Sequence, residues 1–165
     1  MSIKLVDTKD FRPDVAIVGG GASGTLLAAH LLRAGGARVV LIERGDRMGR
    51  GVAYGTGYAG HLLNVPAASM SGIPEDPEHF LRFAREHHDC ATEPTTFVPR
   101  TVYGAYLEWL LAESEQRASP SASLLRWQGD VVDIAGGLLT FADGRRLSAD
   151  RVVLALGNLP PRAPA

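Results

Sequence analysis

Residues 14–43 read DVAIVGGGASGTLLAAHLLRAGGARVVLIE, and the order of residue types in this stretch decides the fold. Residues 14–18 are mostly apolar and end at a glycine, which predicts a short buried strand. Leucines and alanines at helical spacing predict a helix over residues 23–34, which ends before a pair of glycines. Residues 38–42 repeat the pattern of a buried strand. A strand, a glycine turn, a helix and a second strand in this order predict a right-handed βαβ unit with parallel strands.

The turn between the first strand and the helix has the spacing Gly19-x-Gly21-x-x-Gly24. In this context each glycine has its own physical role. Gly19 permits the tight turn, Gly21 lets a pyrophosphate approach the backbone, and Gly24 lets the helix pack close to the strand. The free N–H groups from Ala22 to Gly24 offer an anion site at the helix start. We expect Ser23 to donate a backbone or hydroxyl hydrogen bond to phosphate.

Glu43 lies at the end of the second strand, about 20 residues after the last of these glycines. An acidic side chain at this place accepts the hydroxyl hydrogens of an adenosine ribose and repels a 2′-phosphate, which favours FAD or NAD over NADP. The alternative is a plain turn with Glu43 as a solvated charge, and strand, spacing, helix and acid together argue against it. No Gly-Lys-Ser/Thr follows, so the loop is not a P-loop, and Ser23 lacks the glycine spacing of a nucleophile elbow.

The composition is that of an ordinary globular protein. The chain has 165 residues, 45% hydrophobic and 21% charged, which suits one domain with a real core. A net charge of −1 gives no electrostatic reason to bind nucleic acid or an anionic membrane. The most apolar run, residues 26–32, is far shorter than the roughly 20 residues of a membrane helix. Cys90 is the single cysteine, so we expect no internal disulfide and a reducing, cytoplasmic compartment.

The middle of the chain predicts one long loop and two helices. Residues 44–75 are rich in glycine and predict an irregular loop, and a loop of this length is usually functional. Asp76 is a candidate N-cap before Pro77, and together they predict a helix that ends near residue 87. A second helix is expected over residues 101–116. The expected apolar faces are Leu27, Leu31 and Ala34 on the first helix of the chain, Phe80, Phe83 and Ala84 on the second, and Tyr103, Tyr106, Leu107, Leu110 and Leu111 on the third.

The last third of the chain predicts strands. Residues 125–134, 138–142 and 145–147 alternate with turn signals and predict a small antiparallel meander. Residues 151–156 form one more continuous apolar strand, which ends at Gly157. We expect a single domain over residues 1–165, with an N-terminal extension over 1–13 and a C-terminal tail over 158–165.

Several motifs together resemble a known family. VAIVGGGASG, followed by IER at the end of the second strand, resembles the N-terminal FAD-binding half of flavoproteins with two dinucleotide-binding domains. GRGVAYGT, HLLNVPAASMSG, FVPRTVYGAYL and VVLALGN resemble a narrower family of FAD/NAD(P)-binding proteins related to flavin monooxygenases. The resemblance covers residues 15–157. It implies an α/β fold: a Rossmann-like FAD/NAD(P)-binding domain with a parallel sheet and a small antiparallel three-stranded meander.

The resemblance also implies a role for individual residues. The glycine loop would contact the FAD pyrophosphate, residues 47–51 would cover it with an arginine as counter-charge, and the backbone near Val131 would meet the adenine. Asn64 and His61 could face the flavin or substrate, although the sequence favours a surface histidine and an asparagine that shapes a turn before Val65-Pro66. The same two alternatives, a contact with the flavin or substrate and a purely structural role, apply to Tyr54 and Arg100. The expected cofactor-binding residues are Gly19, Gly21, Ala22, Ser23, Gly24, Glu43, Arg44, Arg50, Gly51, Asn64, Val131 and Gly157.

Other chemistry has weaker support in the sequence. No two of the residues His79, His87, His88 and Cys90 form a standard ligand pair that is matched elsewhere, so we expect no metal site. The aromatic residues Tyr103, Tyr106 and Trp109 lie at helical spacing, which favours a place in the core over a stacking platform.

The sequence therefore predicts the FAD-binding domain of a flavin-dependent, monooxygenase-like oxidoreductase, with NAD(P)H as a candidate electron donor. The alternative is a module or fragment that holds FAD or NAD without turnover, and a dehydrogenase that uses NAD alone is a third hypothesis. In two-domain flavoproteins a second dinucleotide domain brings NAD(P)H to the flavin, and we expect none after Gly157. A second domain or a homo-oligomer would have to supply that function.

Overall fold

The structure is a computed structural model that describes residues 11–158 and contains two sheets and four α-helices in that range. The expected N-terminal extension and C-terminal tail therefore lie largely outside the described residues. The strands of the first sheet are β1 (Val15–Val18), β2 (Arg38–Glu43), β3 (Ser123–Gln128) and β7 (Arg151–Leu154), and those of the second are β4 (Val131–Ala135), β5 (Leu138–Phe141) and β6 (Arg146–Ser148). The helices are α1 (Ala22–Ala34), α2 (Gly51–Tyr54), α3 (His79–His87) and α4 (Arg100–Gln116), and a 3-10 turn, η1, covers Ala67–Ser69.

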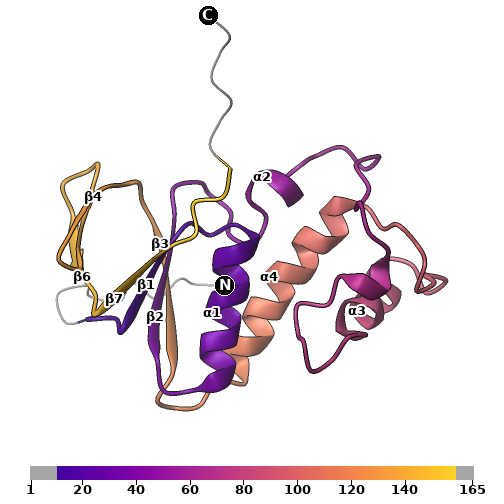
Figure 1. The fold of residues 1–165 in the computed structure, drawn as a ribbon, viewed down its shortest axis with the longest axis horizontal. Coiled ribbons are helices and arrows are strands. Elements are labelled where there is room, and N and C mark those ends of the chain that lie inside the picture. Colours follow the sequence, from indigo (N-terminus) through magenta and orange to yellow (C-terminus); the bar gives the residue numbers. More distant parts are fainter. Residues whose placement is uncertain (1–10, 159–165) are drawn as a thin grey trace, which may run out of the picture.

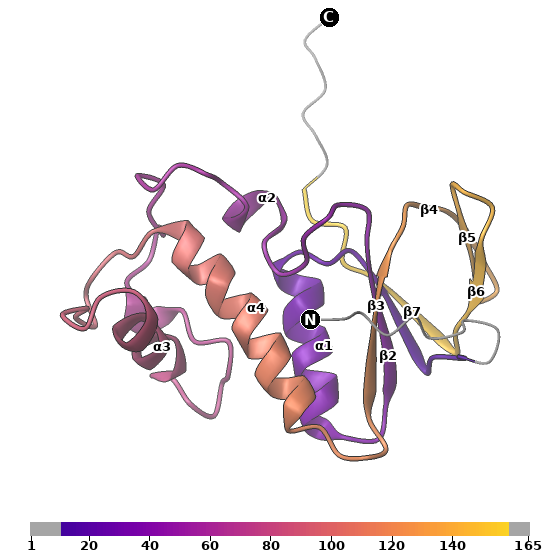
Figure 2. The same cartoon turned by 180° about the vertical axis from the view of Figure 1, so that it is seen from behind.

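The elements are arranged in layers (Figure 1). The first sheet is parallel, has the strand order β3-β2-β1-β7 and lies in the middle. The antiparallel sheet β4-β5-β6 covers one of its faces and α1 covers the other, while α4 packs on α1 and α3 lies beyond α4. Figure 2 shows the same layers from behind. The predicted α/β Rossmann-like fold, with a parallel sheet and a three-stranded antiparallel meander, is confirmed.

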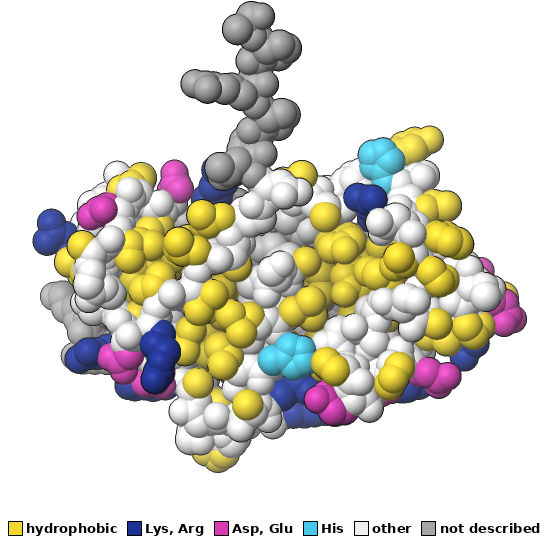
Figure 3. All heavy atoms as spheres, viewed as in Figure 1, with side chains coloured by type: hydrophobic (Ala, Val, Ile, Leu, Met, Phe, Trp, Pro, Cys, Tyr) yellow, Lys and Arg dark blue, Asp and Glu magenta, His cyan; other side chains and the backbone are white. Residues whose placement is uncertain are grey.

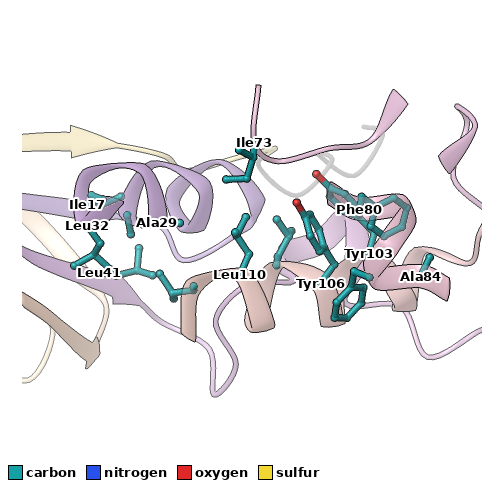
Figure 4. Packing of buried hydrophobic residues seen from close by; sticks show 14 of the residues in the cluster. Ile17, Ala29, Leu32, Leu41, Ile73, Phe80, Ala84, Tyr103, Tyr106 and Leu110 are labelled. Carbon is teal, nitrogen blue, oxygen red and sulfur yellow. The ribbon is translucent and has the colours of Figure 1, made fainter. Parts of the chain in front are cut away.

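The alternation of side chains along β1 and β2 produces two cores, because successive residues of a strand point to opposite faces of the sheet. Ile17 and Leu41 belong to the core that the sheet shares with the helices. Val18 and Ile42 belong to the core between the two sheets, where Trp127 is also buried. Figure 4 shows how the helical core continues away from the sheet, from Ile17, Ala29, Leu32 and Leu41 through Leu110 to Phe80, Tyr103 and Tyr106.

The face of the molecule in Figure 3 carries apolar side chains across its middle, whereas Lys and Arg lie mostly at its edges. The predicted apolar face of α1 differs from the face that is buried. Leu27 and Leu31 are only half-buried and Ala34 is exposed, whereas Ala28, Ala29 and Leu32 form the buried face. The small alanines let α1 pack close to its neighbours. The face predicted to be buried is therefore rotated about the helix axis from the face that is buried. Within residues 11–158, no helix combines the length and apolar character needed to cross a membrane.

The single strand predicted over residues 125–134 was wrong, because it is two strands in two different sheets. β3 pairs in parallel with β2, up to the pair Glu43 and Gln128. The chain then breaks at Gly129, where an added Cβ would lie 2.6 Å from Phe141 Cδ1, and β4 begins the antiparallel sheet. The break falls inside residues 125–134, whose composition predicts one continuous strand.

Two expectations for the middle of the chain also need correction. The helix expected from Asp76 begins at His79 with Glu78 as its N-cap, and the Asp76 carboxylate pairs with the Arg82 guanidinium of the first turn. The loop over residues 44–75 is not wholly irregular, since it contains α2 and η1. The helix expected over residues 101–116 is confirmed as α4, and its predicted apolar stripe is buried.

Candidate functional site

A cleft of ≈ 710 Å³ lies where the carboxyl ends of the parallel strands meet. Its volume is within the range of about 300–1,000 Å³ that is typical of small-molecule sites. In open parallel sheets ligands bind outside this edge. The cleft is lined by residues from the segments 18–23, 42–44, 50–53, 129–131 and 155–158, together with Arg100.

The fold itself requires glycine at the first and last positions of the Gly19-x-Gly21-x-x-Gly24 motif, which runs from the end of β1 into the first turn of α1. Gly19 has a φ of +110°, and a Cβ there would lie 2.2 Å from the carbonyl oxygen of Ala155. A Cβ on Gly24 would lie 1.9 Å from the carbonyl oxygen of Gly19. These contacts give a tight turn at Gly19 and close packing of α1 at Gly24, as the spacing predicts.

Gly21 differs because nothing in the fold requires it to be glycine. Its φ of −71° is available to any residue, and a Cβ would meet nothing closer than Gly51 Cα at 3.6 Å, an ordinary contact. Gly21 nevertheless lines the cleft at the start of α1. The space that a side chain would occupy is therefore open for a group from outside the chain.

The first turn of α1 presents an anion-binding helix end to the cleft. The N–H groups of the first turn have no carbonyl partner within a helix. The first turn of α1 contains no acidic residue, and its N-cap Gly21 has no side chain to accept these hydrogens. Ala22 and Ser23 both line the cleft. Free N–H groups and the positive end of the helix dipole together favour a phosphate at this place.

Glu43 accepts a backbone hydrogen bond at each carboxylate oxygen. The N–H of Gly20 donates to Oε2 at 2.8 Å, and the N–H of Gly45 donates to Oε1 at 2.9 Å. These bonds fix the side chain at the rim of the cleft. A carboxylate has about four acceptor positions, so two remain for a ligand with adjacent hydroxyl groups.

The segment that follows β2 folds back over the glycine loop. The N–H of Gly49 donates to the carbonyl oxygen of Gly20 at 2.7 Å, and a Cβ on Gly51 would lie 3.1 Å from Gly21 Cα. Arg50 lines the cleft, but its guanidinium is held by Glu108 of α4 through bonds of 2.7 and 3.0 Å. This carboxylate raises the pKa of Arg50.

The cleft contains two further cations. Arg44 is exposed at the rim, and no described residue forms an ion pair with it. Arg100 begins α4, and its Nε donates to the carbonyl oxygen of Leu62 at 3.0 Å. With Arg50 they make this edge of the sheet attractive to an anionic ligand.

The structure brings together the predicted binding residues with two exceptions. Gly24 lies behind the loop and acts through packing, and Asn64 is exposed outside the cleft. The residues that line the cleft are Gly19, Gly21, Ala22, Ser23, Glu43, Arg44, Arg50, Gly51, Val131 and Gly157. Sequence analysis missed Val52, Ala53 and Asp130, which also line it. Asp130 follows the end of β3, so a correct boundary at Gly129 would have placed it at the carboxyl edge.

The structure places Arg100 at the cleft, but it places Tyr54 and His61 outside it. Arg100 lines the cleft, whereas Tyr54 packs on Tyr103 with ring centroids 4.7 Å apart, and His61 bonds Thr56 Oγ1 through Nδ1 at 2.7 Å. Neither Tyr54 nor His61 is among the cleft residues.

A buried polar group lies between α3 and α4, outside the cleft. His79 Nδ1 and the Tyr106 hydroxyl are 2.8 Å apart, and the Gly72 N–H donates to the same hydroxyl at 3.0 Å. Burial lowers the pKa of His79 and raises the pKa of Tyr106. Tyr103 and Tyr106 are buried in the helical core, as their spacing predicts.

Solved structures of flavoproteins share the fold of this chain. An oxidized steroid monooxygenase bound to NADP is 25% identical with a TM-score of 0.62, over 94% of this chain and 28% of that one. A flavin-containing monooxygenase from Stenotrophomonas maltophilia is 24% identical with a TM-score of 0.57, over 87% of this chain and 38% of that one. Polyamine oxidase 1 from Oryza sativa subsp. japonica is 38% identical over 72 residues, 42% of this chain and 14% of the oxidase. The chain thus spans well under half the length of each relative.

A family match covers residues 16–159. It begins in β1 and includes the glycine loop, Glu43 at the end of β2 and all five segments that line the cleft. The chain belongs to the FAD-NAD(P)-binding family.

Proposed function

We propose that the chain binds FAD in the cleft at the carboxyl edge of its parallel sheet. The observation that carries the proposal is Gly21. It lies at the start of a helix without acidic residues in its first turn, and the fold leaves its side-chain position open. A pyrophosphate is the part of a dinucleotide that needs this close approach to backbone N–H groups.

The remaining cleft residues suit the other parts of the cofactor. Glu43 has acceptor positions left for the adenosine ribose, and the backbone at Val131 would meet the adenine. Gly157 would close the flavin end, since it lines the cleft and has open space around it. Arg44 and Arg50 would offset the negative charge of the phosphates. Asn64 has no part in this arrangement, because it lies outside the cleft.

The domain would then serve a flavin-dependent, monooxygenase-like oxidoreductase with NAD(P)H as the electron donor. The bound flavin would supply the electron transfer, and the residues of the chain would bind and orient it. The family match and the likeness to a steroid monooxygenase bound to NADP support this proposal. A reducing cytoplasm suits the exposed free thiol of Cys90.

The visible spectrum of the purified protein tests the proposal. We expect flavin absorption bands, and FAD as the nucleotide released on denaturation. A colourless protein that takes up no flavin on titration, yet binds NAD, would overturn the FAD assignment. Addition of NADH or NADPH without oxygen then tests turnover. Bleaching of the flavin supports an oxidoreductase, whereas bound flavin that stays oxidised favours a module that holds FAD without turnover.

A further inference from the structure

The α4 residue Glu108 contacts the dinucleotide cleft only through other residues. Its Oε1 accepts a bond from Arg50 Nε at 2.7 Å, and its Oε2 accepts one from Arg50 Nη2 at 3.0 Å. Arg47 Nη2 also reaches Oε1, at 3.4 Å. Arg50 lines the cleft with a side chain only 19% exposed, whereas Glu108 does not line it. The pair therefore connects α4 to the cleft through one arginine.

The backbone of the same helix face lies unusually close to the segment that carries Arg50. Gly104 and Glu108 are one helical turn apart and share a face of α4. A Cβ on Gly104 would lie 2.9 Å from the Tyr54 carbonyl oxygen and 3.2 Å from Arg50 Cγ. A Cβ on Gly49 would lie 2.9 Å from Glu108 Cγ. Residues 49–54 therefore pack directly on this face.

On its other side the segment touches the glycine loop. Gly49 donates to the Gly20 carbonyl oxygen, and Gly51 lies against Gly21. The segment is therefore held between α4 and the loop that would take the pyrophosphate. Loss of either contact would let Arg50 move relative to the loop.

We propose that Glu108 is a positioning residue for the dinucleotide site, which orients Arg50 toward the pyrophosphate of the ligand. A guanidinium has five N–H donors, and the bonds to Glu108 use two of them, which leaves three for phosphate oxygens. A guanidinium already fixed in a bidentate pair loses little further side-chain entropy when the ligand binds. The inference rests on the proposed function, because it assumes that a pyrophosphate binds at the glycine loop.

A double-mutant cycle tests this role. ADP is titrated into the wild-type protein and into Glu108→Gln, Arg50→Gln and the double variant by calorimetry. Glu108→Gln should weaken ADP binding about tenfold, the worth of one charge-assisted hydrogen bond. The double variant should bind ADP no more weakly than Arg50→Gln alone, because Arg50 lines the cleft and Arg47, the other partner of Glu108, does not.

The matched control is Glu115→Gln. Glu115 lies on the same helix and pairs with Arg126 at 2.7 Å, but neither residue lines the cleft. We expect its ADP affinity to equal that of the wild type. If Glu108→Gln does not fold, Glu108→Asp replaces it in the cycle, since it keeps the charge on a shorter side chain.

Four results would overturn the inference. Unchanged ADP binding by Glu108→Gln would mean that Glu108 does not position Arg50. Tighter ADP binding would mean that Glu108 merely neutralises the charge of Arg50. Additive losses in the double variant would mean that Glu108 acts by a route other than Arg50, such as its contact with Arg47 or the general stability of the fold. A wild-type protein that binds neither ADP nor FAD would overturn the proposed function as well, whereas the first three results leave it standing.

Discussion

Gly24→Ala should lower the free energy of unfolding by about 2 kcal/mol, because overpacking costs up to about 3 kcal/mol and helix propensity returns about 1 kcal/mol. The added methyl group would lie 1.9 Å from the Gly19 carbonyl oxygen and 3.2 Å from Ile17 Cγ2. The first of these is a backbone atom in a turn with a φ of +110°, so it cannot rotate out of the way. The steric term therefore exceeds the gain in helix propensity.

Thermal unfolding followed by circular dichroism measures this loss. For a domain of this size, about 2 kcal/mol corresponds to a drop in Tm of about 4–8 °C. Gly21→Ala is the matched control, because its new Cβ would meet only Gly51 Cα at 3.6 Å. Gly21→Ala should keep the wild-type Tm and lose affinity for ADP. A Gly24→Ala protein as stable as the wild type would refute the close packing of α1 on the loop.

Three further predictions concern single side chains. Burial lowers the pKa of His79 below its ordinary 6.5, so the unfolded state binds the proton more readily than the folded state. The free energy of unfolding should therefore fall as the pH falls below about 6.5, and His79→Gln should make it depend less on pH in urea unfolding. Tyr106→Phe should cost about 1–3 kcal/mol in urea unfolding, because the buried N–H of Gly72 loses its acceptor. Glu43→Gln should reduce the preference for NAD over NADP about tenfold in competition titrations, because the charge that repels a 2′-phosphate is gone.

Local sequence patterns predicted the βαβ unit well. Its strands and helix follow from apolar runs bounded by glycine, and Gly19 and Gly24 have the contacts that their spacing implies. These features depend on neighbours within a short stretch of chain, or on backbone geometry that only glycine allows. The same logic found the meander, because hairpin turns are also local.

Contacts between distant segments could not be predicted in this way. The sequence suggests Arg50 as a counter-charge for phosphate, but nothing near it in the chain reveals its pair with Glu108 on α4. Asn64 was expected at the cofactor, and the structure leaves it exposed, because the backbone around it pairs with residues 96–99. The split between β3 and β4 was missed because the segments on both sides of Gly129 are strand-like, and the partner that puts β3 in the parallel sheet, β2, is distant in the chain.

Backbone amide NMR spectra of the protein, with and without saturating ADP, test the central claim most directly, because they locate the ligand on the chain. The account predicts shifted amide signals in residues 19–24, 43–51 and 129–131, while the signals of α3, which lies beyond α4, stay in place. Signals that shift mainly at α3, or no shift anywhere at saturating ADP, would contradict a dinucleotide site at the carboxyl edge of the parallel sheet.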